Sequence, residues 1–412
     1  MDRRRGAAGA LRTVHAVAAV TLCSALAVGA AAEAPDPAVT ATAAIHSWAA
    51  ARDAAARDHK LVLVEIGAAW CAPCKAFARA TSEAGSLRDV LTAVVLWSVD
   101  AETEPEGRAL AQKHAIQGLP TFLLLDGAGV VLDRWAGFTG RAEFELQLTG
   151  ALQDPLPAAA RAARFDAHPN AADALRLARF RAAEANIPAA LRYYTHAREL
   201  APEDGHEFEA LRVAATGFAT GRAAAADVQA TASAFLARPE HPAAEWIACA
   251  EWLQTVAQRE KSPALAWPAL RAVVTHATGA LDSTLATRRD ALLVQHALEI
   301  EKNPERAVVY KRRTLPAGFE HDPRAVNAFA WWCLKYAVNL PEAERLMRQA
   351  AREAPPGRDR AMMLDTVAEI CAARGDARDA AVFAEAARRE FPENPYYAKQ
   401  VARFRAPLAA KP

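Results

Sequence analysis

The feature that most constrains this chain is a pair of closely spaced cysteines, Cys71 and Cys74, in the segment W-C-A-P-C-K that begins at Trp70. The segment follows directly on the apolar run 61–66, which has the composition of a buried strand. A cysteine at the start of a helix faces unpaired N–H groups and the positive end of the helix dipole, which stabilise a thiolate. Two intervening residues also let the second sulfur reach the first and close a small disulfide ring. The segment therefore predicts a redox-active pair at a strand-to-helix turn.

The length and the net charge of the chain limit the number of domains and the class of partner that we expect. A chain of 412 residues exceeds one ordinary domain, so we expect two or three domains. Apolar residues make up 52% of the chain, which is ample for packed cores, and abundant alanine and arginine favour helix. The formal net charge of +1 gives no electrostatic reason to expect nucleic acid as a partner.

The N-terminal segment 1–32 has the pattern of an export signal. Three arginines at positions 3–5 precede an apolar stretch over 17–32, and Ala30-Ala31-Ala32 offers a small-residue cleavage site before Glu33. We expect a cleaved signal peptide and a periplasmic or secreted protein. The alternative is an uncleaved N-terminal membrane anchor, because the apolar stretch approaches the shortest spanning length. Either location is one where disulfides form and persist.

Residues 40–153 are predicted to form one α/β domain. Alternating short apolar runs and helical patterns end in two strands joined through Asp126-Gly127, a strong tight-turn signal. The expected helices cover 41–58, 71–84, 106–114 and 141–152, and the expected strands cover 61–66, 94–99, 121–125 and 130–135.

The remainder is predicted to be a linker over 154–170 and an all-α domain over 171–405. The linker is rich in proline and alanine and lacks clear periodicity. Beyond it, small or apolar residues recur at matching positions in three segments that end in Pro202, Pro355 and Pro392. This is the pattern of tetratricopeptide (TPR) repeats, in which two antiparallel helices cross closely and a proline follows. Residues 208–323 are helical in pattern but too degenerate to divide into repeats.

With these residues in hand, segment 40–153 resembles the thioredoxin superfamily, and within it exported thioredoxin-like domains such as the C-terminal periplasmic domain of the transmembrane disulfide reductant. Three features carry the resemblance: W-C-x-P-C-K after a strand, Glu65 six residues before Cys71, and Gly118-Leu119-Pro120-Thr121 at the start of the third strand. The expected fold class is therefore an α/β thioredoxin-like domain followed by an all-α, TPR-like helical-repeat domain.

The resemblance implies a role for each site residue. Cys71 corresponds to the attacking cysteine and Cys74 to the resolving one, while Glu65 stands where the family keeps a buried acid that exchanges a proton with Cys74. Pro120 matches the family's cis-proline, which turns the Leu119 backbone toward an extended substrate segment.

Trp70 corresponds to the residue that shields one side of the disulfide. The family often has a lysine in the second strand beside the buried acid, whereas this strand offers Leu96, Trp97 and Ser98. This departure leaves the tuning of the acid open. No cofactor is expected.

Each assignment has a structural alternative. Glu65 could face solvent at a strand edge, Pro120 could be trans and merely start a strand, and Trp70 could be ordinary packing. Cys71 and Cys74 could be half of a zinc site, but a structural site needs four ligands and the chain has no second C-x-x-C or C-x-x-H. We therefore expect no metal.

The remaining cysteines outside the N-terminal segment, Cys249, Cys333 and Cys371, lie in helical patterns beside apolar neighbours. They are predicted to be buried, free thiols that pack as small hydrophobes. A disulfide between Cys333 and Cys371 is the alternative, although packed helix axes about 8–10 Å apart exceed the reach of a disulfide.

Two functions follow as hypotheses. The first is an exported thiol–disulfide oxidoreductase, most simply a reductase of protein disulfides, whose helical domain recruits a protein partner and which depends on a separate membrane electron donor. The second is an interaction scaffold in which the helical array binds a protein or peptide and the thioredoxin-like domain is a docking module.

Overall fold

The computed structural model describes residues 45–82 and 87–409, and its first part is built on a four-stranded sheet in the order β2-β1-β3-β4. β1 and β2 run parallel, and β3 runs antiparallel to both β1 and β4. As a result, the carboxyl ends of β1 and β2 lie at the same end of the sheet as the start of β3. The strands are β1 (Leu61–Gly67), β2 (Val94–Asp100), β3 (Thr121–Leu125) and β4 (Val131–Ala136).

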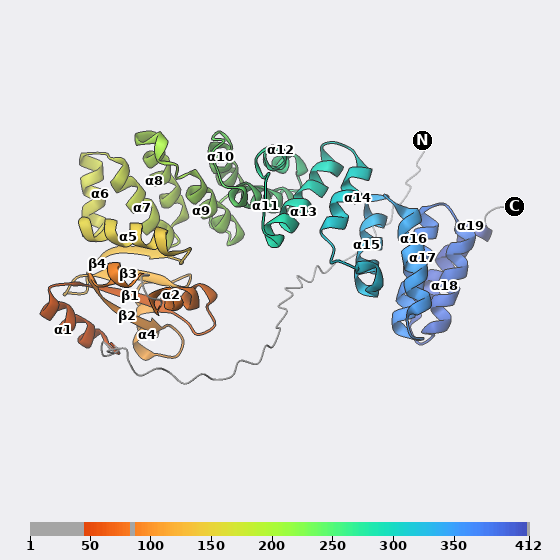
Figure 1. Ribbon diagram of the computed structural model, residues 1–412, viewed down its shortest axis with the longest axis horizontal. Coiled ribbons are helices and arrows are strands. Elements are labelled where there is room, and N and C mark those ends of the chain that lie inside the picture. The colour runs from red at the N-terminus through yellow and green to blue at the C-terminus, as the bar shows by residue number, and fades with distance from the viewer. Residues whose placement is uncertain (1–44, 83–86, 410–412) are drawn as a thin grey trace, which may run out of the picture. The chain divides into compact units, whose positions relative to one another are not determined.

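Helices cover both faces of this sheet (Figure 1). Because side chains alternate along a strand, Val62, Val64 and Ile66 face one layer while Leu63 faces the other. The first layer holds α1 (Trp48–Asp58) and α4 (Pro105–Lys113), and the second holds α2 (Ala72–Ser82), the short α3 (Arg88–Leu91) and α5 (Arg141–Gln153).

This architecture confirms the expected α/β thioredoxin-like domain. The strands agree with the sequence-based ranges to within one residue, and β3 matches at both ends. In the predicted turn, the Asp126 carboxylate accepts hydrogen bonds from Ala128 N–H and Val130 N–H at 2.9 and 2.8 Å. The expected signal peptide 1–32 and the beginning of the expected first helix, residues 41–44, lie outside the described residues.

The segment predicted as a linker, 154–170, contains the helix α6 (Ala158–Ala167). The buried face of α6 is marked by Arg161 and Phe165 rather than by an apolar stripe, which is why periodicity did not predict it. Arg161 is 3% exposed and donates hydrogen bonds to Asp154 and Asp173 at 2.6 and 2.9 Å.

A second arginine joins the sheet to the helices. Arg176, on α7 (Ala171–Ala183), donates hydrogen bonds from Nη2 and Nε to the Asp133 carboxylate of β4 at 2.8 and 3.2 Å. Both side chains are largely buried, with exposed fractions of 15% and 12%. The thioredoxin-like domain and the first helices are therefore in direct contact.

From α6 onward the described chain is helical, which confirms the expected all-α second region. After α7 the helices are α8 (Ile187–Leu200), α9 (Glu207–Ala219), α10 (Ala225–Leu236), α11 (Ala243–Arg259), α12 (Trp267–His276), α13 (Ser283–Glu299), α14 (Pro304–Arg313), α15 (Pro323–Tyr336), α16 (Leu340–Glu353), α17 (Arg358–Ala373), α18 (Ala377–Glu390) and α19 (Pro395–Ala409).

The three segments with matching small residues are helical pairs: α7 with α8, α15 with α16, and α17 with α18. Their alanines at the predicted positions, such as Ala178 with Ala190 and Ala368 with Ala380, are fully buried. Small side chains let the two helices of a pair approach closely. The pairing supports the repeat pattern, while the identification as TPR repeats stays a prediction.

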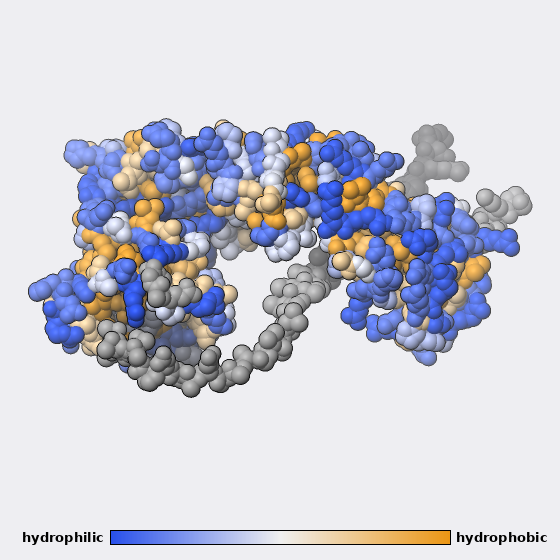
Figure 2. All heavy atoms as spheres, in the orientation of Figure 1, coloured by the Kyte–Doolittle hydropathy of each residue, from blue (hydrophilic) through white to orange (hydrophobic). Residues whose placement is uncertain are grey.

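The surface of the visible face is mainly hydrophilic, with apolar patches between the polar side chains (Figure 2). No helix among the described residues combines the length and the hydrophobicity needed to cross a bilayer.

Candidate redox site

Cys71 and Cys74 form a disulfide at the point where β1 gives way to α2, with their Cα atoms 5.3 Å apart. Cys71 N–H donates a hydrogen bond to Ala68 C=O at 3.0 Å, which closes the turn before the helix. Cys74 N–H points at Cys71 Sγ from 3.2 Å. A free N–H group at the start of a helix stabilises negative charge on that sulfur, so Cys71 is the member of the pair that is set up to become a thiolate.

The pair is almost covered by protein. Cys71 is 2% exposed and Cys74 is 8% exposed, and both pack against Ala68 and Leu119. Trp70, predicted to shield the disulfide, has 66% of its surface exposed. A large apolar side chain beside a buried reactive pair offers contact area to an incoming substrate.

The loop before β3 presents free backbone next to the cysteines. The Leu119–Pro120 peptide bond is cis, as the resemblance implied. Thr121 Oγ1 donates to Gly118 C=O at 2.7 Å, and Gly137 N–H donates to Pro120 C=O at 2.8 Å, so the loop is held on both sides of Leu119. Within the described part of the chain, no backbone hydrogen bond uses the N–H or C=O of Leu119 itself. Such a stretch can pair with an extended peptide.

Glu65 lies inside the sheet layer and not in solvent, with 7% of its surface exposed. A Cβ atom placed on Gly67 would lie 2.6 Å from Glu65 Oε1 and 3.3 Å from Cys74 Sγ. Because both distances are measured from the same point, Glu65 Oε1 and Cys74 Sγ cannot be more than about 6 Å apart. Desolvation by burial raises the pKa of Glu65, the charge of Asp100 raises it further, and a hydrogen bond with Ser98 opposes the shift. Glu65 is thus placed to hold or accept a proton next to the resolving cysteine.

Three residues of the site were missed by the sequence analysis as contributors: Gly67, Ser98 and Asp100. Ser98 is the register partner of Glu65 on β2, at the position where the resemblance led us to look for a lysine. Asp100, at the end of β2, accepts a hydrogen bond from Ala69 N–H at 3.1 Å and so holds the turn that leads to Trp70. Hydrogen bonds from Thr103 N–H and Glu102 N–H lower the pKa of Asp100, which keeps it ionised. The expected α/β topology could have indicated Gly67 and Asp100, because the carboxyl ends of adjacent parallel strands lie together.

Cys249, Cys333 and Cys371 are free and buried, as predicted, and the alternative Cys333–Cys371 disulfide was wrong. Burial raises the pKa of Cys249 and Cys333 to about 12 and that of Cys371 to about 11. These thiols are therefore unreactive at neutral pH.

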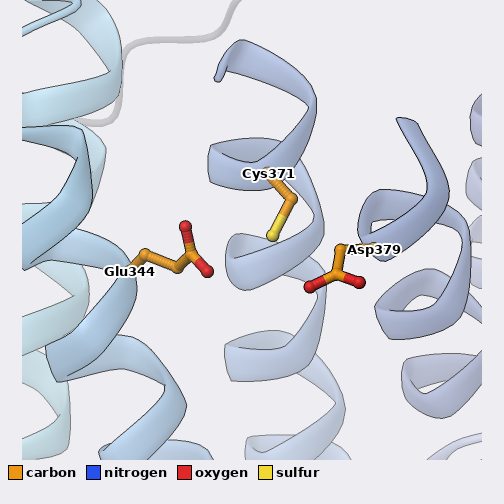
Figure 3. Close-up of side chains that lie close together, drawn as sticks. All are labelled: Glu344, Cys371 and Asp379. Atoms are coloured by element: carbon orange, nitrogen blue, oxygen red, sulfur yellow. The ribbon is translucent and has the colours of Figure 1, made fainter. Parts of the chain in front are cut away.

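Cys371 lies near two carboxylates, those of Glu344 and Asp379, in a group that could in principle bind a cation (Figure 3). Arg348 already bridges it: Nη2 lies 2.6 Å from Glu344 Oε1, 2.7 Å from Asp379 Oδ2 and 3.8 Å from Cys371 Sγ. The guanidinium supplies the positive charge that these groups need, so the cluster is an ion-pair network that joins α16, α17 and α18.

Comparison with known proteins agrees with this geometry. Residues 43–127 match a protein-family model described as thioredoxin-like. Thioredoxin H4 of Arabidopsis thaliana is 26% identical over 90 residues, which cover 22% of this chain and 71% of that protein. Thioredoxin-2 of Pyricularia oryzae is 35% identical over 89 residues (21% and 48%), and protein disulfide-isomerase of Hordeum vulgare is 35% identical over 86 residues (21% and 17%).

Among solved structures, the oxidised C-terminal domain of Neisseria meningitidis DsbD is 22% identical, with a TM-score of 0.22 over 26% of this chain and 90% of that domain. The chain spans 17% of the barley isomerase, so the likeness concerns one domain of each protein.

The fold and the site define a class: this chain carries a thioredoxin-like domain with a C-x-x-C disulfide, joined to a long all-helical region. Its likeness to thioredoxins and protein disulfide-isomerases supports thiol–disulfide oxidoreductase chemistry at Cys71 and Cys74.

Proposed function

We propose that this protein is an exported thiol–disulfide oxidoreductase that reduces disulfides in other proteins. The observation that carries the proposal is the convergence of four groups at one sheet edge: Cys71 at the start of α2, Cys74 beside it, buried Glu65 behind Cys74, and the free backbone of Leu119. A nucleophile, a resolving thiol, a proton acceptor and a peptide-binding edge are what disulfide reduction requires.

The reaction begins with both cysteines reduced. The Cys71 thiolate attacks one sulfur of a substrate disulfide, forming a mixed disulfide and releasing the other substrate sulfur as a thiolate. Cys74 then loses its proton to the Glu65 carboxylate and attacks Cys71 Sγ. The Cys71–Cys74 disulfide forms, the second substrate sulfur leaves, and two electrons have moved from enzyme to substrate.

The reducing direction rests on the residues between the cysteines. A histidine there would strongly favour the thiolate and make an oxidant, whereas this chain has Ala72-Pro73. Continued reduction outside the cytoplasm needs electrons from across the membrane, so a separate membrane electron donor is part of the proposal.

Export itself is proposed from the N-terminal segment, with its arginines, apolar stretch and Ala30–Ala32 site. The mass of the protein isolated from its native cell tests it. A chain that begins at Glu33 supports a cleaved signal, whereas an intact, membrane-bound N-terminus supports the anchor.

The helical region is proposed to recruit the protein partner. A surface groove of about 840 Å³ is lined by apolar and charged side chains of α15, α17 and α19, among them Trp331, which is 44% exposed. This groove also favours the second candidate function, an interaction scaffold. Trp331→Ala is expected to change which proteins a Cys74→Ser variant traps as mixed disulfides, without changing the reduction of a small disulfide.

The deciding experiment is the reduction potential of the Cys71–Cys74 couple in the full mature protein, measured by equilibration with dithiothreitol mixtures. A value near that of thioredoxin, about −270 mV, supports the reductase, and one near about −120 mV makes the protein an oxidant. Without a reversible couple, the enzyme hypothesis fails and the scaffold remains. Cys71→Ser must abolish the activity.

A further inference from the structure

The helical region also contacts the loop that precedes β3, at a point separate from the Arg176–Asp133 contact between α7 and β4. Arg222 Nη2 donates a hydrogen bond to Gln117 Oε1 at 2.8 Å, across 105 residues of sequence. Gln117 lies two residues before Leu119, which packs on the cysteines. Since two extended residues span at most about 7 Å, the Arg222 guanidinium is hydrogen-bonded to a residue whose backbone lies within about 7 Å of the Leu119 backbone.

Arg222 projects from a turn whose backbone is well anchored between α9 and α10. Gly221 has a φ of 72°, and Arg222 N–H donates to Gly217 C=O at 2.7 Å. On the far side of the turn, Asp227 accepts a hydrogen bond from Ala224 N–H at 2.8 Å. The backbone that carries the Arg222 side chain is therefore held in place by these hydrogen bonds.

The charge of Arg222 is uncompensated. The residue is exposed, and among the described residues it forms no ion pair. Gln117 is neutral and accepts one hydrogen bond, whereas a guanidinium carries five N–H donors. Acidic Asp100 lies at the end of β2, on the other side of β1 from β3, and accepts hydrogen bonds from three backbone N–H groups. Arg222 thus adds an exposed positive charge beside the loop that precedes β3.

We propose that Arg222 is a specificity-determining residue, which selects disulfide segments carrying a glutamate or aspartate two or three residues from the attacked cysteine. A segment that pairs with the backbone of Leu119 runs toward Gln117 and brings its side chains within reach of the guanidinium. The inference rests on the proposed function, because it concerns the substrate of that same site.

The test uses the full mature protein and single-turnover reduction. Pre-reduced enzyme is mixed with peptide dimers linked by one disulfide, in which the residues two positions from each cysteine are all Glu, all Gln or all Lys. Each turnover oxidises one enzyme dithiol and releases two peptide thiols. Bis(2-hydroxyethyl) disulfide, which has no flanking residues, serves as the neutral reference.

Wild-type protein should reduce the Glu peptide about three- to tenfold faster than the Lys peptide. This range corresponds to one exposed ion pair between Arg222 and the Glu peptide and one repulsion between Arg222 and the Lys peptide. Arg222→Gln should abolish this preference and Arg222→Glu should reverse it, with the rate on the small disulfide unchanged. The preference should also weaken at high salt because the charges are exposed.

Arg198→Glu is the matched control, since Arg198 is an exposed arginine of α8 with no ion pair among the described residues. It makes the same change of charge and should leave the preference intact. An unchanged preference in Arg222→Glu, or an equal change in Arg198→Glu, overturns the inference. Failure to reduce even the small disulfide defeats the proposed function itself, so the two failures are distinguishable.

Discussion

At the scale of single residues, the chemistry of the site depends on Gly67 as much as on the cysteines. It lies between Glu65 and Cys74, where any side chain would occupy the space through which the carboxylate approaches the sulfur. The glycine is required for space, not for backbone conformation, because its φ lies outside the left-handed region.

Gly67→Ala is expected to destabilise the protein by about 1–3 kcal/mol, the usual cost of overpacking, and to slow release of the mixed disulfide. The added Cβ would meet Glu65 Oε1 at 2.6 Å and push the carboxylate away from Cys74. Chemical denaturation and single-turnover kinetics measure the two effects. Gly127→Ala, at a position with open space around it, is the control and should be nearly neutral.

The clash itself can be tested by shortening its partner. In the Gly67→Ala background, Glu65→Ala should recover much of the lost stability but none of the lost rate. If stability does not recover, the alanine is destabilising for a reason other than contact with Glu65.

Glu65→Gln is expected to change how stability depends on pH. Burial raises the pKa of Glu65 above its ordinary value of 4.5, so between that value and the raised one the folded protein holds a proton that the unfolded chain has lost. The contribution of Glu65 to stability therefore falls as pH rises through this window, and the variant should gain stability relative to wild type at pH 8 but not at pH 4.

Denaturation of the oxidised proteins at both pH values makes the measurement without interference from the titration of Cys71 and Cys74. The exposed Glu102→Gln control should show no such difference. Because a general base typically contributes about a hundredfold or more, Glu65→Gln should also slow the resolving step by about a hundredfold or more. Equal resolving rates would remove Glu65 from the mechanism.

At the scale of elements, ion pairs between charged side chains help to hold neighbouring helices together, in addition to apolar packing. Arg348 bridges Glu344 on its own helix, Asp379 on α18 and the Cys371 sulfur on α17. Its neighbours are partly exposed, since Glu344 and Asp379 retain 11% and 39% of their side-chain surface, so solvent weakens each pair.

Arg348→Met should lower the stability of the helical region by about 1–3 kcal/mol, between the values for exposed and buried pairs, because two carboxylates lose a shared partner. Arg345→Met, on the same helix but 63% exposed and 3.9 Å from its partner Glu342, should cost less than about 0.5 kcal/mol. Thermal unfolding of the two variants measures the difference. Equal losses would mean that the bridge contributes nothing beyond side-chain packing.

At the scale of the whole molecule, the contact between β4 and α7 ties the redox domain to the helices. The Asp133–Arg176 pair is largely buried, and Arg176 also donates a hydrogen bond to Asp154 C=O at 3.0 Å. A buried carboxylate that loses its partner is left with an uncompensated charge.

Arg176→Met is expected to cost about 3–5 kcal/mol at this junction and to separate the unfolding of the two regions into distinct transitions. Calorimetry together with limited proteolysis near 154–158 measures it. Arg181→Met, on the same helix with a partner only three residues away, should leave a single pattern of unfolding. A single transition in Arg176→Met would show that other contacts hold the junction.

What the sequence determined by itself is local. The strand, the cysteine spacing and the helix start that follows all lie within 61–82, so short-range patterns predicted them. The helical pairs were predictable for the same reason, because each repeats small residues at fixed spacing within about 30 residues. The cis bond before Pro120 was implied by the family resemblance of the segment that starts β3.

What only the tertiary structure decided involves residues that are distant in sequence. Burial of Glu65 beside Cys74 depends on which face of β1 meets α2, and alternation along an apolar strand does not choose that face. The helix α6 was hidden because its inward side chain Arg161 is charged and is stabilised by acids at positions 154 and 173. The contact of Arg222 with Gln117 joins residues 105 apart, and no local pattern encodes it. Local preferences act within a few residues, whereas burial and charge pairing are set by the fold that brings those residues together.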